Sequence, residues 1–119
     1  MNKLEELSEQ RKKAHGKMLS LKSKVYETFL EMEKATYCDG ALPRKTKELI
    51  AIGISVVLDC KSCMQWHIEQ AAKTGASEQE VLEAIEVGIE MACGRATVSS
   101  RFALDVMDSA YGNGTPGKK

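Results

Sequence analysis

Residues 49–67 read LIAIGISVVLDCKSCMQWH, an apolar run that ends in two cysteines separated by two residues, with a histidine four residues later. The run from Leu49 to Leu58 is apolar on all sides, which indicates a buried segment, although periodicity alone does not distinguish a helix from a strand. If a helix starts at Cys60, the side chains of Cys60, Cys63 and His67 share one face, because residues three, four and seven apart are neighbours there. This stretch therefore predicts two thiols and an imidazole side by side, next to a buried segment.

Three interpretations fit this group of side chains. A close cysteine pair in a reducing cytosol is typical of redox catalysis or metal binding, and His67 could act as the base that takes the proton of Cys63. A zinc site would use Cys60, Cys63 and His67, although structural zinc sites generally join two separate ligand pairs. Its fourth ligand would come from Glu48, Cys38, Cys93 or His15. Inert packing thiols are the third interpretation; Cys93 is in any case expected as a small core residue.

The composition argues against several classes of partner. The 119 residues carry 17 basic and 17 acidic side chains, so the formal net charge is zero, whereas nucleic-acid binding normally requires an excess of Lys and Arg. The longest apolar run is too short to span a bilayer, and residues 1–11 are polar and charged, unlike a secretory signal peptide. We expect a cytoplasmic protein that binds neither nucleic acid nor membrane.

The apolar spacing predicts an all-α fold of about five helices, with no convincing strand. Side chains three, four or seven residues apart predict one long helix over residues 2–35, disturbed near Gly16. Its apolar stripe is suited to packing against another subunit. After a turn at residues 36–43, we expect buried and helical segments over residues 44–58 and 60–74, with Asp59 as a cap for the second.

The C-terminal part is also predicted to be helical. Gly75 is a natural helix stop, and Ser77 with Glu80 forms a capping box for the next helix. Gly94 marks a bend or a close helix contact before a last helix that ends near Ala110. We expect one domain over residues 1–111 and a disordered tail over residues 112–119.

The same pattern argues against a thioredoxin-like fold. That fold also places a CxxC pair at a helix start, but it needs further strands and a cis-proline beside the thiols. Here every segment after Cys63 has helical spacing, and the only later proline is Pro116.

Glu48 is the last charged residue before the apolar run. The pattern alone describes a surface charge one turn into a helix. If the segments 44–58 and 60–74 pack as a hairpin, however, its carboxylate would be drawn towards the thiols, where it could hold a proton or orient His67.

Residues 42–88, LPRKTKELIAIGISVVLDCKSCMQWHIEQAAKTGASEQEVLEAIEVG, resemble the carboxymuconolactone decarboxylase / alkylhydroperoxidase D (AhpD-like) family. The redox-active branch of that family carries a glutamate, a CxxC pair twelve residues later, and a histidine four residues beyond the second cysteine. Glu48, Cys60, Cys63 and His67 match this spacing at every position. The resemblance implies an AhpD-like helical subunit that assembles into trimers or hexamers, of which we expect the hexamer.

The resemblance also implies a cofactor-free thiol peroxidase, or alternatively a reductase of small-molecule or protein disulfides. Cys63 would attack the peroxide and become a sulfenic acid, and Cys60 would condense with it to a disulfide, while Glu48 and His67 relay protons. A thioredoxin-like or lipoyl protein, or a small thiol, would then restore the pair. Ser62 stands where the best-known member has a histidine, which bears on the strength of the thiolate. The decarboxylase branch lacks the paired cysteines, so lactone decarboxylation is not expected, and a zinc-binding or assembly module is the non-enzymatic alternative.

Overall fold

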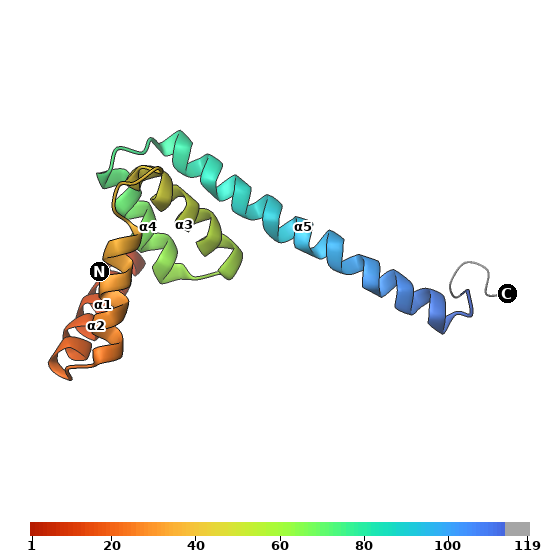
Figure 1. The fold of residues 1–119 in the computed structure, drawn as a ribbon, viewed down its shortest axis with the longest axis horizontal. Helices are drawn as coiled ribbons and strands as arrows, with labels where there is room; N and C mark the ends of the chain where they lie inside the picture. The colour runs from red at the N-terminus through yellow and green to blue at the C-terminus, as the bar shows by residue number, and fades with distance from the viewer. Residues whose placement is uncertain (114–119) are drawn as a thin grey trace.

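The computed structural model describes residues 1–113, which form five helices and no strand (Figure 1). These are α1 (Lys3–Ser20), α2 (Lys24–Thr36), α3 (Arg44–Leu58), α4 (Lys61–Lys73) and α5 (Glu78–Ala110). The all-α class and the count of five helices are therefore confirmed. The disordered tail predicted for residues 112–119 lies, from residue 114 onward, outside the described residues.

The N-terminal region consists of two helices, so the prediction of one long helix over residues 2–35 is wrong. Lys22 adopts a left-handed backbone conformation with a φ of 56° and reverses the chain. Ser23 then caps α2 by accepting the backbone N–H of Tyr26 at 3.1 Å. Gly16, where a disturbance was expected, lies inside α1. Lysine in a left-handed conformation is uncommon, so the residue types at this position do not predict a turn.

In the C-terminal region, two helices were expected and one is present. α5 continues through Gly94 as a single helix of 33 residues. At a rise of about 1.5 Å per residue it is about 50 Å long. It begins with the predicted capping box: Ser77 Oγ accepts the Glu80 N–H at 3.1 Å, and the Glu80 carboxylate accepts the Ser77 N–H at 2.9 Å. One helix more at the N-terminus and one fewer at the C-terminus leave the predicted count unchanged.

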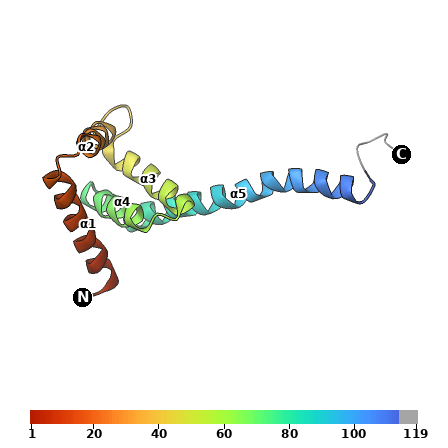
Figure 2. The same cartoon turned by 90° about the horizontal axis from the view of Figure 1, so that it is seen from below.

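The centre of the fold is α3, which packs against α4 on one side and α5 on the other (Figures 1 and 2). The backbones of α3 and α5 approach closely where Gly53 faces Gly88, since a Cβ atom at Gly88 would lie 2.7 Å from the Gly53 carbonyl oxygen. Among the described residues, the buried apolar side chains are Ala51, Ile52 and Ala71. This core is small for a chain of such length.

The folded chain is elongated rather than compact. Its Cα radius of gyration is 20.8 Å, whereas a compact domain of this length has about 13.5 Å. The C-terminal half of α5 projects away from the other helices (Figure 1), and many large apolar side chains on α1, α2 and α5 are exposed. Across residues 1–113, no helix combines the length and the hydropathy needed to cross a membrane.

Candidate active site

A one-residue turn sets the position of the cysteine pair. Asp59 ends α3 in the left-handed conformation, with φ 52° and ψ 43°, and the next backbone N–H, that of Cys60, is donated back to the Ser55 carbonyl at 3.1 Å. Cys60 is thus the N-cap of α4, and its sulfur accepts the Cys63 N–H at 3.2 Å. The expectation that Asp59 caps this helix is wrong, because Asp59 is needed for the turn. Aspartate tolerates this conformation better than most residues.

Cys60 and Cys63 are joined by a disulfide, with their Cα atoms 5.2 Å apart. Both residues are half-buried, whereas Lys61 and Ser62 between them are exposed. Cys38 and Cys93 are free and exposed. The expectation of Cys93 as a core residue is therefore wrong for this chain.

The hairpin of α3 and α4 brings Glu48 and His67 together. Glu48 lies on the α4-facing side of α3 and is 1% exposed. Its Oε1 atom lies 2.7 Å from His67 Nδ1. His67 follows Cys63 by four residues on α4, a spacing that places the two residues on the same face of that helix.

Two further polar side chains, which the sequence analysis did not single out, extend this pair. Arg44 Nε lies 3.5 Å from Glu48 Oε2. Arg44 Nη2 donates to Gln70 Oε1 at 2.8 Å, and Gln70 is 7% exposed. Helical spacing could have indicated both residues, because Arg44 precedes Glu48 by four positions and Gln70 follows His67 by three, and residues at these spacings are neighbours on a helix.

Tyr37, the C-cap of α2, completes the group from a third element. Its ring centroid lies 5.0 Å from that of His67, with the two planes tilted by 38°. Burial raises the pKa of Tyr37, and the nearby carboxylates of Glu48 and Glu33 raise it further. Tyr37 is therefore a neutral phenol near neutral pH. Nothing local in the sequence indicates this contact, because it joins residues thirty positions apart.

The outer side of α4 is covered by α1. The Arg11 guanidinium lies 4.6 Å from the ring centroid of Trp66. Gln65 Nε2 donates to the Leu4 carbonyl at 3.0 Å and to Ser8 Oγ at 2.9 Å. These contacts hold α1 against the residues that directly precede His67.

The ligands considered for a zinc site are not assembled. In the part of the chain that the structure describes, no three His, Cys, Asp or Glu side chains are grouped as a metal site. His15, one candidate for the fourth ligand, lies instead with its Nδ1 atom 2.6 Å from the Tyr26 hydroxyl, where it joins α1 to α2.

Comparisons with known proteins give consistent results. The family model described as carboxymuconolactone decarboxylase matches residues 23–105. A relative from Paracoccus denitrificans, called uncharacterized protein 4 in cox locus, is 36% identical over 88 residues, which cover 74% of this chain and 79% of the relative. A carboxymuconolactone decarboxylase family protein from Legionella pneumophila has a similar structure, with a TM-score of 0.73 and 26% identity over 92% of this chain and 97% of that one. A Thermotoga maritima structure has a TM-score of 0.66 and 27% identity over 92% and 98% of the two chains.

Proposed function

Because the chain belongs to the carboxymuconolactone decarboxylase family, and because it carries a CxxC pair, we propose that it is a thiol–disulfide oxidoreductase with peroxidase activity. The observation that carries the proposal is the disulfide between Cys60 and Cys63 at the start of α4, the helix that also carries His67 with its hydrogen-bonded partner, the buried Glu48. A disulfide that can form between two half-buried residues at a helix start is suited to a reversible redox reaction.

In the proposed cycle, the Cys63 thiolate attacks one oxygen of the hydroperoxide. The O–O bond breaks, the alkoxide leaves as an alcohol after gaining a proton, and Cys63 becomes a sulfenic acid. The Cys60 thiolate then attacks the Cys63 sulfur, water leaves, and the disulfide seen in the structure forms. An external dithiol returns two electrons and two protons and is itself oxidised to a disulfide.

The surrounding groups support this division of roles. His67 Nδ1 is engaged by Glu48, so Nε2 is the ring nitrogen available to take the thiol proton and later to return it to the leaving group. The Cys60 sulfur accepts a backbone N–H at the start of α4. Because backbone donors at a helix start stabilise negative charge, Cys60 is suited to act as the resolving thiolate.

Reduction of a small-molecule or protein disulfide is the second candidate. It is favoured by the exposure of Asp59, Lys61 and Ser62 around the pair, since a bulky disulfide substrate requires an open approach to the attacking sulfur. The same cysteines and the same proton relay would operate, with a thiol rather than an alcohol as the leaving group.

A donor screen distinguishes the two activities. Turnover of an alkyl hydroperoxide and of oxidised glutathione would be measured with thioredoxin, a lipoyl protein or a small thiol as donor. We expect Cys63→Ser to abolish peroxide-dependent loss of thiols. In Cys60→Ser, by contrast, a sulfenic acid should accumulate that dimedone traps. Full turnover by Cys63→Ser would contradict the proposed cycle, and an unchanged pH–rate profile for Glu48→Gln would remove the carboxylate from the relay.

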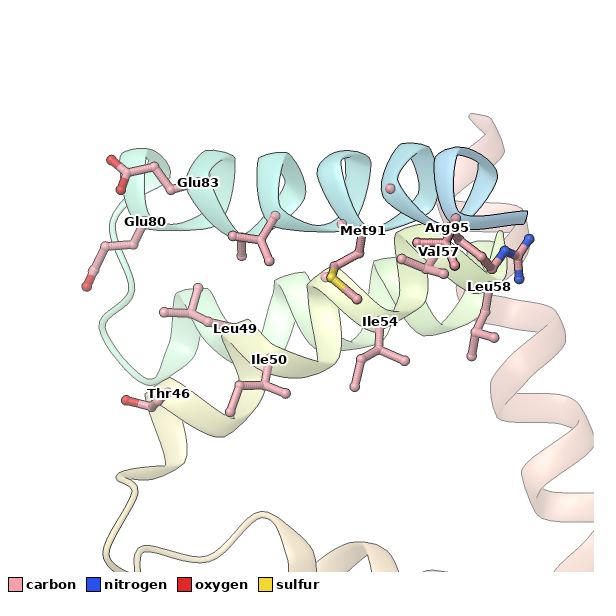
Figure 3. Close-up of a pocket in the computed structure, with 16 residues that line it drawn as sticks. Thr46, Leu49, Ile50, Ile54, Val57, Leu58, Glu80, Glu83, Met91 and Arg95 are labelled. Atoms are coloured by element: carbon pink, nitrogen blue, oxygen red, sulfur yellow. The ribbon is translucent and has the colours of Figure 1, made fainter. Parts of the chain in front are cut away.

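We also propose that the active form is a homo-oligomer, with the hexamer favoured. An apolar groove of about 1100 Å³ runs between α3 and α5. Figure 3 shows Glu80 and Glu83 at one end of this groove and Arg95 at the other, with aliphatic side chains such as Ile54 between them. A groove of this size on so small a core leaves much apolar surface in water.

The occupant that the chain itself supplies is α5 of a second copy. The projecting half of α5 carries exposed Phe102 and Val106, with exposed fractions of 74% and 50%. These residues follow one another at four-residue spacing and share a face, which suits insertion into an apolar groove. The same half carries Arg101 and Asp105, which have the charges needed to meet the groove's acidic end and its arginine.

Light scattering after gel filtration tests this assembly. The wild-type chain should elute as a hexamer at micromolar concentration, whereas Phe102→Asp should dissociate into smaller species while remaining helical by circular dichroism. Lys3→Asp, at the far end of the subunit, serves as a control and should not change the mass. A monomeric wild-type protein would contradict the proposal.

A further inference from the structure

The carboxyl group of Glu48 lies inside the protein, where it needs polar or charged partners. It is 1% exposed, and an ionised carboxylate removed from water is unfavourable unless an opposite charge lies close to it. A neutral His67 donates a hydrogen bond to Glu48 but does not balance its charge. The cation within reach is Arg44, whose Nε atom lies 3.5 Å from Glu48 Oε2.

Arg44 is held in this position from α4. Its Nη2 group donates to Gln70 Oε1 at 2.8 Å, and Gln70 is almost fully buried. The buried Nε atom has no hydrogen-bond partner, so Arg44 acts on the carboxylate through its charge rather than through a hydrogen bond. Gln70 thus fixes a guanidinium beside the second oxygen of Glu48.

We propose that Arg44 is a positioning residue: it competes with His67 for the charge of the Glu48 carboxylate and so keeps the imidazole available to accept the proton of Cys63. With Glu48 alone, His67 would gain from taking a second proton and forming an imidazolium–carboxylate pair, and it could then no longer act as a base. Arg44 makes this extra proton less favourable. The inference rests on the proposed function for its link to Cys63, but not for its effect on His67.

The other charged groups around the pair do not supply this balance. On α3, Lys45 Nζ lies 3.1 Å from a Glu80 carboxylate oxygen, and Lys47 Nζ donates to the Cys38 carbonyl at 2.8 Å. From α2, Tyr37 faces His67 as a neutral phenol, with Glu33 near it. From α1, the Arg11 guanidinium lies over Trp66. Within residues 1–113, Arg44 is the cation that pairs with Glu48.

The direct test follows the His67 ring by NMR across pH. The chain has two histidines, so His15→Gln assigns their signals. We expect Arg44→Met to move the titration midpoint of His67 to higher pH, and Arg44→Lys to restore most of the wild-type value because it keeps the charge. Lys45→Met removes a cation from the adjacent position that pairs elsewhere, so this control should leave the midpoint unchanged.

Two further measurements exclude a merely structural effect. Gln70→Leu, which releases Arg44 without removing its charge, should move the midpoint in the same direction by less. In a Glu48→Gln background, Arg44→Met should have little further effect, because the carboxylate that the guanidinium balances is gone. Circular dichroism would verify that each variant is folded.

The activity readout separates this inference from the proposed function. Reduced Arg44→Met should react with hydroperoxide more slowly than the wild type near neutral pH, and the difference should disappear at higher pH. If the wild-type protein has no thiol redox activity, the proposed function fails while the NMR titration still decides the role of Arg44. An Arg44→Met midpoint equal to that of the wild type, or an equal shift in Lys45→Met, would overturn the inference.

Discussion

Replacing Gly88 by alanine should destabilise the fold, although alanine is the better helix former. Gly88 is buried where α5 crosses α3. A Cβ atom there would lie 2.7 Å from the Gly53 carbonyl oxygen and 3.0 Å from Val56 Cβ. The first contact is with the backbone of another helix, which cannot rotate aside as a flexible side chain would. The two helices must therefore separate to accept the methyl group.

The expected magnitude is the difference between two effects. Alanine gains about 1 kcal/mol in helix propensity over glycine, whereas overpacking in a well-packed contact costs about 1–3 kcal/mol. Because the contact involves a backbone atom, we place the cost in the upper part of that range, which leaves a net loss of about 1–2 kcal/mol. For a chain of this size, such a loss lowers Tm by roughly 4–8 °C.

Urea unfolding followed by circular dichroism, at one fixed protein concentration, measures this loss. The concentration is fixed because any assembly would couple to unfolding. Gly16→Ala is the matched control: nothing lies within 4 Å of its added Cβ, so it should gain about 0.5–1 kcal/mol. A Gly88→Ala variant at least as stable as the wild type would show that the crossing widens freely, and would refute the reasoning.

Three other outcomes are expected. Alkaline titration should show one of the three tyrosines ionising above the ordinary value of 10.0, since the pKa of Tyr37 is raised by burial and by Glu48. The stability that its neutral form contributes is complete below the unfolded pKa and is lost as pH rises through the folded pKa, so Tyr37→Phe should lessen the alkaline loss. Ser77→Ala removes the α5 cap and should cost about 1 kcal/mol by urea unfolding. Reduced protein purified without added metal should contain only substoichiometric zinc by elemental analysis; one zinc per chain would instead favour the metal-binding alternative.

The parts of the fold that the sequence predicted are those with a local chemical signal. The capping box at Ser77 and the stop at Gly75 have strong residue preferences, and the structure has a helix boundary at each. The turn at Lys22 has no such residue preference, because lysine rarely adopts the left-handed conformation and here does so where α1 and α2 meet. Gly94, conversely, suggested a bend, but a glycine inside a helix is tolerated, and here it lines the apolar groove.

The site divides in the same way. Cys60, Cys63 and His67 are close in sequence, so helical spacing alone predicts that they share a face, and the structure joins the two cysteines in a disulfide. Glu48 entered through the spacing of a known family, and its hydrogen bond to His67 depends on how α3 packs against α4. Tyr37 reaches the imidazole only because α2 ends beside α4. Contacts of this kind depend on tertiary packing, which residue preferences do not encode.

One atom in this protein serves two bonds of different kinds. The Cys60 sulfur forms half of the disulfide and also receives the Cys63 amide at the first turn of α4. Each redox cycle therefore changes the charge and the conformational freedom of the Cys60 side chain, which caps the first turn of α4. The oxidised and reduced proteins should therefore differ in the rate of hydrogen exchange at the first backbone amides of α4. A partner that binds this end of the helix would then distinguish the two oxidation states without contacting the sulfurs.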